Sequence, residues 1–283
     1  MTPLPLLGGN NGSAAGVNDL DEVAGSAENS TPEPSCKGTN QVLQAKPVIW
    51  RKGKVHELRT YAGDPMGVAH AVNNKGQAAG NTGTCTASLH AVLWQNGRPI
   101  DLGNLGGTMW NRAEDINEQG QVVGWSGLLG DTSFHAYLWQ TGGMTDLGTL
   151  PGDVSSGATG VNSRGRVVGG SIDASGNERA FVWQKGVMTD LNTLIEPNSP
   201  WYLLEADGIN DWGQIVGYAY VYSSGEVHIF LATPSHGKDV SEDAAPSEPS
   251  QRPKVTLPES IRKLVQQRLR FGRRLGGGAV NLP

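Results

Sequence analysis

Cysteine, charge and long apolar runs are all scarce in this sequence of 283 residues, and each shortage excludes a class of protein. Two cysteines are too few for a disulfide-rich framework or a four-cysteine zinc site. No apolar run approaches the roughly 18 residues that a membrane-spanning helix requires. A net charge of −5 offers no general attraction to phosphates, so we expect no nucleic-acid partner.

Signals for export, catalysis and cofactor binding are missing as well. The first nine residues, MTPLPLLGG, have neither the charged start nor the apolar core of a signal peptide. The sequence has no G-x-S-x-G elbow, H-E-x-x-H pair, P-loop or dinucleotide fingerprint. The string DASGNE lacks the glycine spacing and the distant glutamate of a calcium loop. We therefore predict no catalytic residue, no metal site and no cofactor.

Glycine is abundant, with 40 residues, and much of it belongs to an internal repeat. One string carries an asparagine, a turn and a short apolar strand, and it occurs at residues 15–25, 70–80, 114–124, 159–169 and 207–217. A second string, such as HAVLW or HAYLW, follows each copy, and a third, such as MTDLGTL, closes the first four units. The period is near 45 residues, which is typical of propeller blades.

Each unit predicts four short strands joined by tight turns. Asparagine suits the first position of a type I turn, and glycine accepts the left-handed conformation that follows. The middle strands carry consecutive apolar residues, as in Val122 and Val123, which indicates burial on both faces. We expect an all-β fold, a β-propeller of about five four-stranded blades. LPLLGG at residues 4–9 resembles LGNLGG at 102–107, so the N-terminal strand would close the ring by completing the last blade. The alternative is a fragment of a longer array.

Together, HAVLW, MTDLGTL and GINDWGQIVG resemble the repeats of the extracellular HAF repeat family over residues 1 to about 233. The repeat has departures at Lys46, Pro47 and Arg179 and in the last copy, which ends in Ala232 where the others have tryptophan. The period is still recognisable. The resemblance implies export, to the extracellular space or the cell envelope, and a repeat fold. It implies no activity.

In each unit, the turns between the first and second strands and between the third and fourth strands are nearly identical in every copy. The other connections lie at the opposite end of the strands and differ in length and content. Function usually lies on variable loops held by a rigid framework, so we place a ligand site at that end. Non-repeating aromatic and polar residues in these connections are its candidates: Trp110, Arg112, Glu114, Trp201, Tyr202 and Glu205. Aromatic faces beside polar groups suit a sugar or a peptide, although loop aromatics also fold back onto the core.

Residues that return in every copy are assigned to the framework. The acidic series formed by Glu57, Asp101, Asp146 and Asp190 predicts a turn or strand hydrogen bond in each blade, not a cation site. The tryptophan series Trp50, Trp94, Trp139 and Trp183 predicts packing between blades. Cys36 and Cys85 lie in matching loops of successive blades, which favours a disulfide and an oxidising compartment over two free thiols.

The composition changes after residue 233. Residues 234–255 are rich in Pro, Ser and acids and indicate a disordered linker, and residues 256–283 indicate a short basic amphipathic helix with a glycine-rich end. The tail holds 9 basic and 5 acidic residues, against 13 and 22 in the repeats. Such a helix would lie on an anionic membrane surface, dock on the acidic repeats or stay solvated.

These observations favour a non-catalytic extracellular or envelope-associated binding module. We expect a monomer with an unknown protein or glycan ligand on the variable loop face. The alternative is a glycoside-active hydrolase that uses acids on the same face. Fold alone does not decide between the two.

Overall fold

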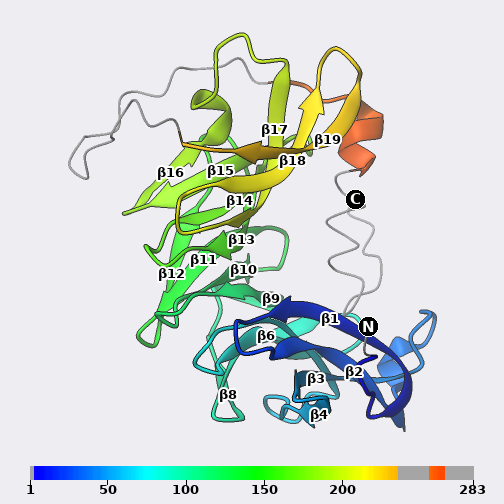
Figure 1. Cartoon of the computed structure of the whole chain (residues 1–283). Coiled ribbons are helices and arrows are strands. Elements are labelled where there is room, and N and C mark those ends of the chain that lie inside the picture. Colours follow the sequence, from blue (N-terminus) through cyan, green and yellow to red (C-terminus); the bar gives the residue numbers. More distant parts are fainter. Residues whose placement is uncertain (1–2, 235–254, 265–283) are drawn as a thin grey trace.

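The computed structural model describes residues 3–234 and 255–264 and contains five successive antiparallel strand units, here called blades 1 to 5 (Figure 1). Blade 1 contains β1 (Gly8–Val17), β2 (Val23–Pro32), β3 (Leu43–Arg51) and β4 (Lys54–Glu57). Blade 2 contains β5 (Met66–Val72), β6 (Ala78–Gly83), β7 (Ser88–Gln95) and β8 (Arg98–Asp101). Blade 3 contains β9 (Gly106–Ile116), β10 (Val122–Leu128), β11 (Phe134–Gln140) and β12 (Gly143–Gly148).

Blade 4 contains β13 (Ser155–Val161), β14 (Val167–Ile172), β15 (Glu178–Gln184) and β16 (Val187–Asp190). Blade 5 contains β17 (Trp201–Ile209), β18 (Ile215–Val221) and β19 (Glu226–Ala232). Two short 3-10 helices, η1 (Pro34–Cys36) and η2 (Leu191–Thr193), lie in connections. Among the described residues, no helix is long and apolar enough to cross a membrane.

Each blade is an antiparallel meander, in which strands adjacent in the chain pair with each other. The predicted all-β fold of four-stranded units is therefore confirmed for blades 1 to 4, and blade 5 has three strands in the described part of the chain. A single parallel bridge between Ser88 and Trp110 links blades 2 and 3.

The hairpin turns form as the sequence predicts. In blade 2 the Gly76 N–H donates to the carbonyl of Asn73, and Gly76 has φ of +71°. In blade 1 Asp21 stands at the glycine position, with φ of +58°. A non-glycine residue is tolerated there because aspartate visits the left-handed region more readily than most residues do.

The core lies between blades. The first strand of each of blades 2 to 5 packs across the preceding blade. Val122 and Val123 show why the middle strands have consecutive apolar residues: Val122 belongs to the apolar cluster shared with blade 2 and Val123 to the one shared with blade 4. Both side chains are fully buried.

The blades form an open arc, and the expected closure of the ring is wrong. Blade 1 and blade 5 lie at opposite ends of the arc (Figure 1), and no apolar cluster of the described residues joins them. The N-terminal residues pack on blade 1 instead, where Leu6 and Leu7 contact the cluster around Trp50. Trp50 Nε1 also donates to the carbonyl of Pro5 at 2.7 Å, which fixes this segment on its own blade.

In the C-terminal segment, residues 255–264 lie against blade 5, and a helix runs over residues 259–264. Leu257 and Ile261 are buried against Tyr202, Leu204 and Tyr220. The start of the expected helix is thus present. Most of the predicted linker and the glycine-rich end lie outside the described residues.

Candidate functional site

The two ends of the blades differ in character. Tight turns between the first and second strands and between the third and fourth strands gather at one end, here called the turn end. The longer connections gather at the other, here called the loop end: residues 33–42, 58–65, 84–87, 102–105, 129–133, 149–154, 173–177, 191–200 and 222–225.

A ladder of asparagines fixes the turn end. The side-chain amide of each asparagine donates to the backbone carbonyl of the next one along the chain: Asn18 to Asn73 at 3.0 Å, Asn73 to Asn117 at 3.0 Å, Asn117 to Asn162 at 2.9 Å and Asn162 to Asn210 at 3.2 Å. Each side-chain oxygen also accepts backbone N–H groups of its own turn, as Asn117 does from Gln119 and Gln121. The recurring asparagine therefore joins every blade to the next.

Most of the other recurring residues also belong to the framework, but the prediction of packing between blades is wrong for Trp50, which packs within its own blade against Leu6 and Leu7. Asp101, Asp146 and Asp190 each accept the N–H of the residue two positions later, at 2.8 to 3.0 Å. Trp94 is 1% exposed and packs in the cluster that joins blades 1 and 2, and its Nε1 donates to the carbonyl of Arg59.

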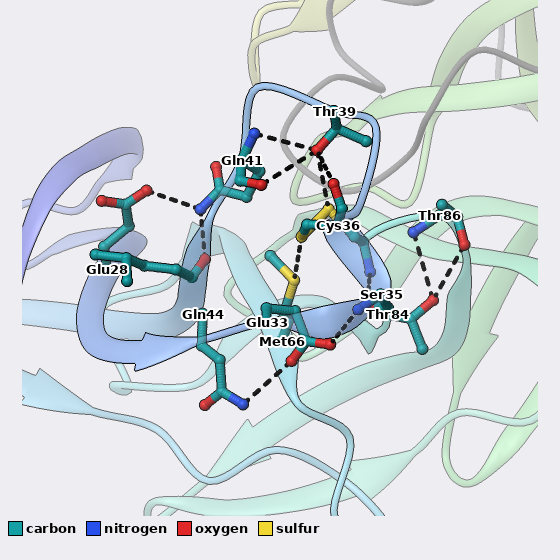
Figure 2. The surroundings of a disulfide bond; sticks show 12 residues. Glu28, Glu33, Ser35, Cys36, Thr39, Gln41, Gln44, Met66, Thr84 and Thr86 are labelled. Atoms are coloured by element: carbon teal, nitrogen blue, oxygen red, sulfur yellow. Dashed lines mark hydrogen bonds between the residues drawn. A yellow bond between two sulfur atoms is a disulfide. The ribbon is translucent and has the colours of Figure 1, made fainter.

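At the loop end, a disulfide joins blades 1 and 2 (Figure 2). The expected pair, Cys36 and Cys85, is bonded across a sequence separation of 49 residues. Both cysteines are buried beside Ala45 and Met66. The Cys85 N–H donates to Ser35 Oγ at 3.1 Å, so the two connections are held together by more than the covalent bond.

The carboxylate of Glu33 organises the connection that contains Cys36. It accepts the Ser35 N–H at 3.0 Å and the Gln44 side-chain amide at 3.1 Å (Figure 2). Burial alone would raise the pKa of Glu33, but these hydrogen bonds and the charge of Lys46 outweigh it and lower the pKa. This carboxylate therefore supports the loop.

The candidates of blade 3 lie in β9 and not in a loop, because this strand begins at Gly106. Trp110 is half-buried, whereas Arg112 is buried and forms an ion pair with Glu114. The same carboxylate accepts Trp125 Nε1 at 3.1 Å. Arg112 and Glu114 thus form a partly buried polar cluster on the first strand of the blade.

This cluster extends to blade 2 through His70, whose Nδ1 lies 3.4 Å from Arg112 Nη2. His70 Nε2 lies 2.9 Å from Asn81 Oδ1. Burial, reinforced by the positive charge of Arg112, lowers the pKa of His70 to about 4. The imidazole is consequently neutral at pH 7 and serves as a polar bridge between the two blades.

The candidates of blade 5 are separate from those of blade 3, since blade 4 lies between the two blades (Figure 1). They also lie in a strand, β17. Trp201 packs against the cluster between blades 4 and 5, with its ring centroid 6.0 Å from that of His228. Tyr202 is buried beneath Leu257, and Glu205 is half-buried. The predicted residues therefore form two groups, and the aromatic pair is directed largely into the core.

Sequence reasoning missed a set of exposed apolar side chains at the loop end and in the adjoining start of β9. They are Val42, Met109, Leu129, Val154, Leu194 and Tyr222. Leu129 is 87% exposed, at the tip of a connection held by Asp131, which accepts the backbone N–H groups of Thr108 and Met109. No repeat marks these residues, and only their position in connections of variable length identified the region.

No family model and no curated protein matches this sequence. Among solved structures, it is similar to dipeptidyl peptidase 4 of Porphyromonas gingivalis, at 13% identity and a TM-score of 0.39, over 73% of this chain and 34% of that one. It is also similar to XC5397 of Xanthomonas campestris, described as a gluconolactonase, at 13% identity and a TM-score of 0.40, over 80% and 77% of the two chains.

Proposed function

We propose that this chain is a non-catalytic interaction module of the cell envelope or extracellular space, and that its loop end binds a protein. The exposed apolar side chains at that end carry the proposal. They come from blades 1, 3 and 5 and from the connections on both sides of blade 4. Each of these side chains that a partner covers favours association, because burying it releases water.

The framework supports this role. The asparagine ladder holds the turn end, and the disulfide ties two connections of the loop end together. Connections held in this way lose little conformational entropy on binding, which favours affinity. Since disulfides persist in oxidising compartments, the same bond supports a location outside the cytoplasm.

The candidate acids for glycoside chemistry are Glu114, Asp115 and Glu205, and the first two make contacts within the protein. Glu114 is engaged by Arg112 and Trp125. Asp115 accepts the backbone N–H groups of Val161 and Ile116, and burial raises its pKa. Hydrolysis needs one acid and one base that both reach the sugar, and these contacts direct the two side chains to partners within the protein.

The test places a photo-crosslinking amino acid at Leu129, and at Gln119 as the matched control. Gln119 is an exposed residue of the same blade, at the turn end. After illumination with an extracellular and envelope protein fraction, we expect discrete adducts at Leu129 and none at Gln119. Leu129→Glu should compete poorly for the captured protein. Equal adducts at both positions would contradict the proposal, and turnover of any glycan in a parallel hydrolysis screen would support the hydrolase.

A further inference from the structure

One interface recurs four times within the chain, between each blade and the next. At the junction of blades 4 and 5, Val168 and Ala180 of blade 4 are fully buried against a cluster that includes Ile215 of blade 5. Each of blades 2 to 4 thus has one face that packs on its predecessor and another that packs on its successor. In an array of this kind, stability comes largely from such nearest-neighbour interfaces.

On blade 5, no further blade of residues 3–234 and 255–264 covers the successor face. Val216, Ile229 and Leu231 occupy the positions of Val168, Ala180 and Val182 in the repeat, and they are 46%, 78% and 63% exposed. Residues 255–264 cover the part of this face near the loop end, and the half near the turn end is open. The outer edge of β19 also lacks a fourth strand in the described part of the chain.

Blade 1 presents only the part of the predecessor face near the turn end, because residues 4–7 already bury Val48 and Trp50 on the rest of it. Val17 is 69% exposed, whereas the matching Val72 and Val161 are 8% and 5% exposed beneath their neighbours. Residues 4–7 lie where the connection from a preceding blade lies in blade 3. Leu7 forms a parallel bridge with the second strand of blade 1, as Leu105 does with the second strand of blade 3. The exposed part of blade 1 is therefore the part that a preceding blade covers in blades 2 and 4.

The hydrogen bonds at the two ends are complementary. On blade 5 the Asn210 amide has no blade-to-blade acceptor, and the Asp211 N–H has no acceptor, among residues 3–234 and 255–264. Within the array such N–H groups donate to the next blade, as Asp19 N–H does to Asn74 Oδ1 at 2.9 Å. Blade 1 offers the corresponding acceptors, the Asn18 carbonyl and the Asp19 carboxylate, one oxygen of which already accepts the Asn74 side-chain amide at 2.7 Å.

We propose that these faces join two copies of the chain, with blade 1 of one copy docked on blade 5 of the other. The chain's own blade 1 lies at the far end of the arc (Figure 1), so a second copy is the partner that continues the array. The contact is head-to-tail, and such contacts generate rings or open filaments, not closed two-fold dimers. This proposal differs from the monomer expected from the sequence.

The test uses the full chain with one face blocked at a time. Val17→Asp blocks blade 1 and Leu231→Asp blocks blade 5, and both side chains are exposed, so each variant should fold. We expect the wild type to form dimers and larger species with rising concentration in sedimentation velocity. Each variant alone should remain monomeric, with association weakened at least about tenfold, because docking would bury an unpaired charge.

A mixture of the two variants decides the matter. Each still has one intact face, so a one-to-one mixture should form a heterodimer and nothing larger. A wild type that is monomeric at all concentrations would overturn the proposal. Ring closure within one chain would give that result. A mixture that stays monomeric, or single variants that associate as the wild type does, would overturn it as well.

Discussion

Removal of one asparagine from the ladder should cost far more inside the array than at its end. The Asn117 side chain is 6% exposed and makes three hydrogen bonds within its own turn and one to the carbonyl of Asn162. Asn210 makes the same three bonds in its turn, is half-buried and makes no bond to a following blade within the described residues.

With about 1 kcal/mol for each net hydrogen bond, and more for buried groups left unpaired, Asn117→Ala should lower the free energy of unfolding by about 3 kcal/mol. Asn210→Ala should lower it by about 1 kcal/mol, because water replaces the lost contacts at the exposed end. Urea denaturation followed by tryptophan fluorescence measures both losses. Losses that agree within about 0.5 kcal/mol would refute the idea that the ladder links the blades.

Three further predictions concern other parts of the molecule. Reduction of the Cys36–Cys85 bond, which closes a loop with a separation of 49 residues, should lower the free energy of unfolding by up to about 4 kcal/mol; the native protein should show no alkylatable thiol, and two would contradict the bond. Leu257→Ala, at a side chain 1% exposed, should detach residues 255–264 and remove their amide protection in hydrogen exchange, while unchanged protection would argue against the docking. Since the pKa of His70 is lowered to about 4, stability should fall as the pH drops from about 6.5 to 4, because the unfolded chain binds the proton first. His70→Gln should flatten this part of a urea-midpoint profile, and an unchanged slope would contradict the assignment.

Much of the fold follows from the repeat. The spacing of the asparagines fixed the number of blades, and the pair Val122 and Val123 indicated that each sheet is covered on both faces. Asp101 and Asp146 were correctly assigned to turn or strand hydrogen bonds. Each accepts a backbone N–H only two residues away, so the hydrogen bond is repeated wherever the motif is repeated.

Closure could not be derived in the same way. The likeness of residues 4–9 to 102–107 is real and appears in the matching bridges of Leu7 and Leu105. The likeness shows that residues 4–9 match the connection that enters a blade, but it does not show which blade they join. Every blade has a second strand with which such a segment can pair. The packing of Leu6, Leu7 and Trp50 decides that point, and it depends on contacts that no short motif encodes.

The candidate site was recovered only in part for a similar reason. Trp110 and Trp201 do not recur, so the repeat gave no boundary for their strands, and both were placed in loops that are in fact strands. The pairing of Cys36 with Cys85 was accessible because the repeat aligned their connections. The exposure of Leu129 depends on the course of its connection, about which the sequence is silent.

Fluorescence energy transfer between blades 1 and 5 distinguishes an open arc from a closed ring. Leu20→Cys and Trp212→Cys place dyes at exposed turns of blades 1 and 5, and the native disulfide leaves no other reactive thiol. In chains that carry both dyes, at nanomolar concentration where chains are separate, we predict low transfer efficiency. In a mixture of chains that carry only the donor and chains that carry only the acceptor, we predict that the transfer efficiency rises with concentration. High efficiency within single dilute chains would contradict the open arc and show that each chain closes on itself.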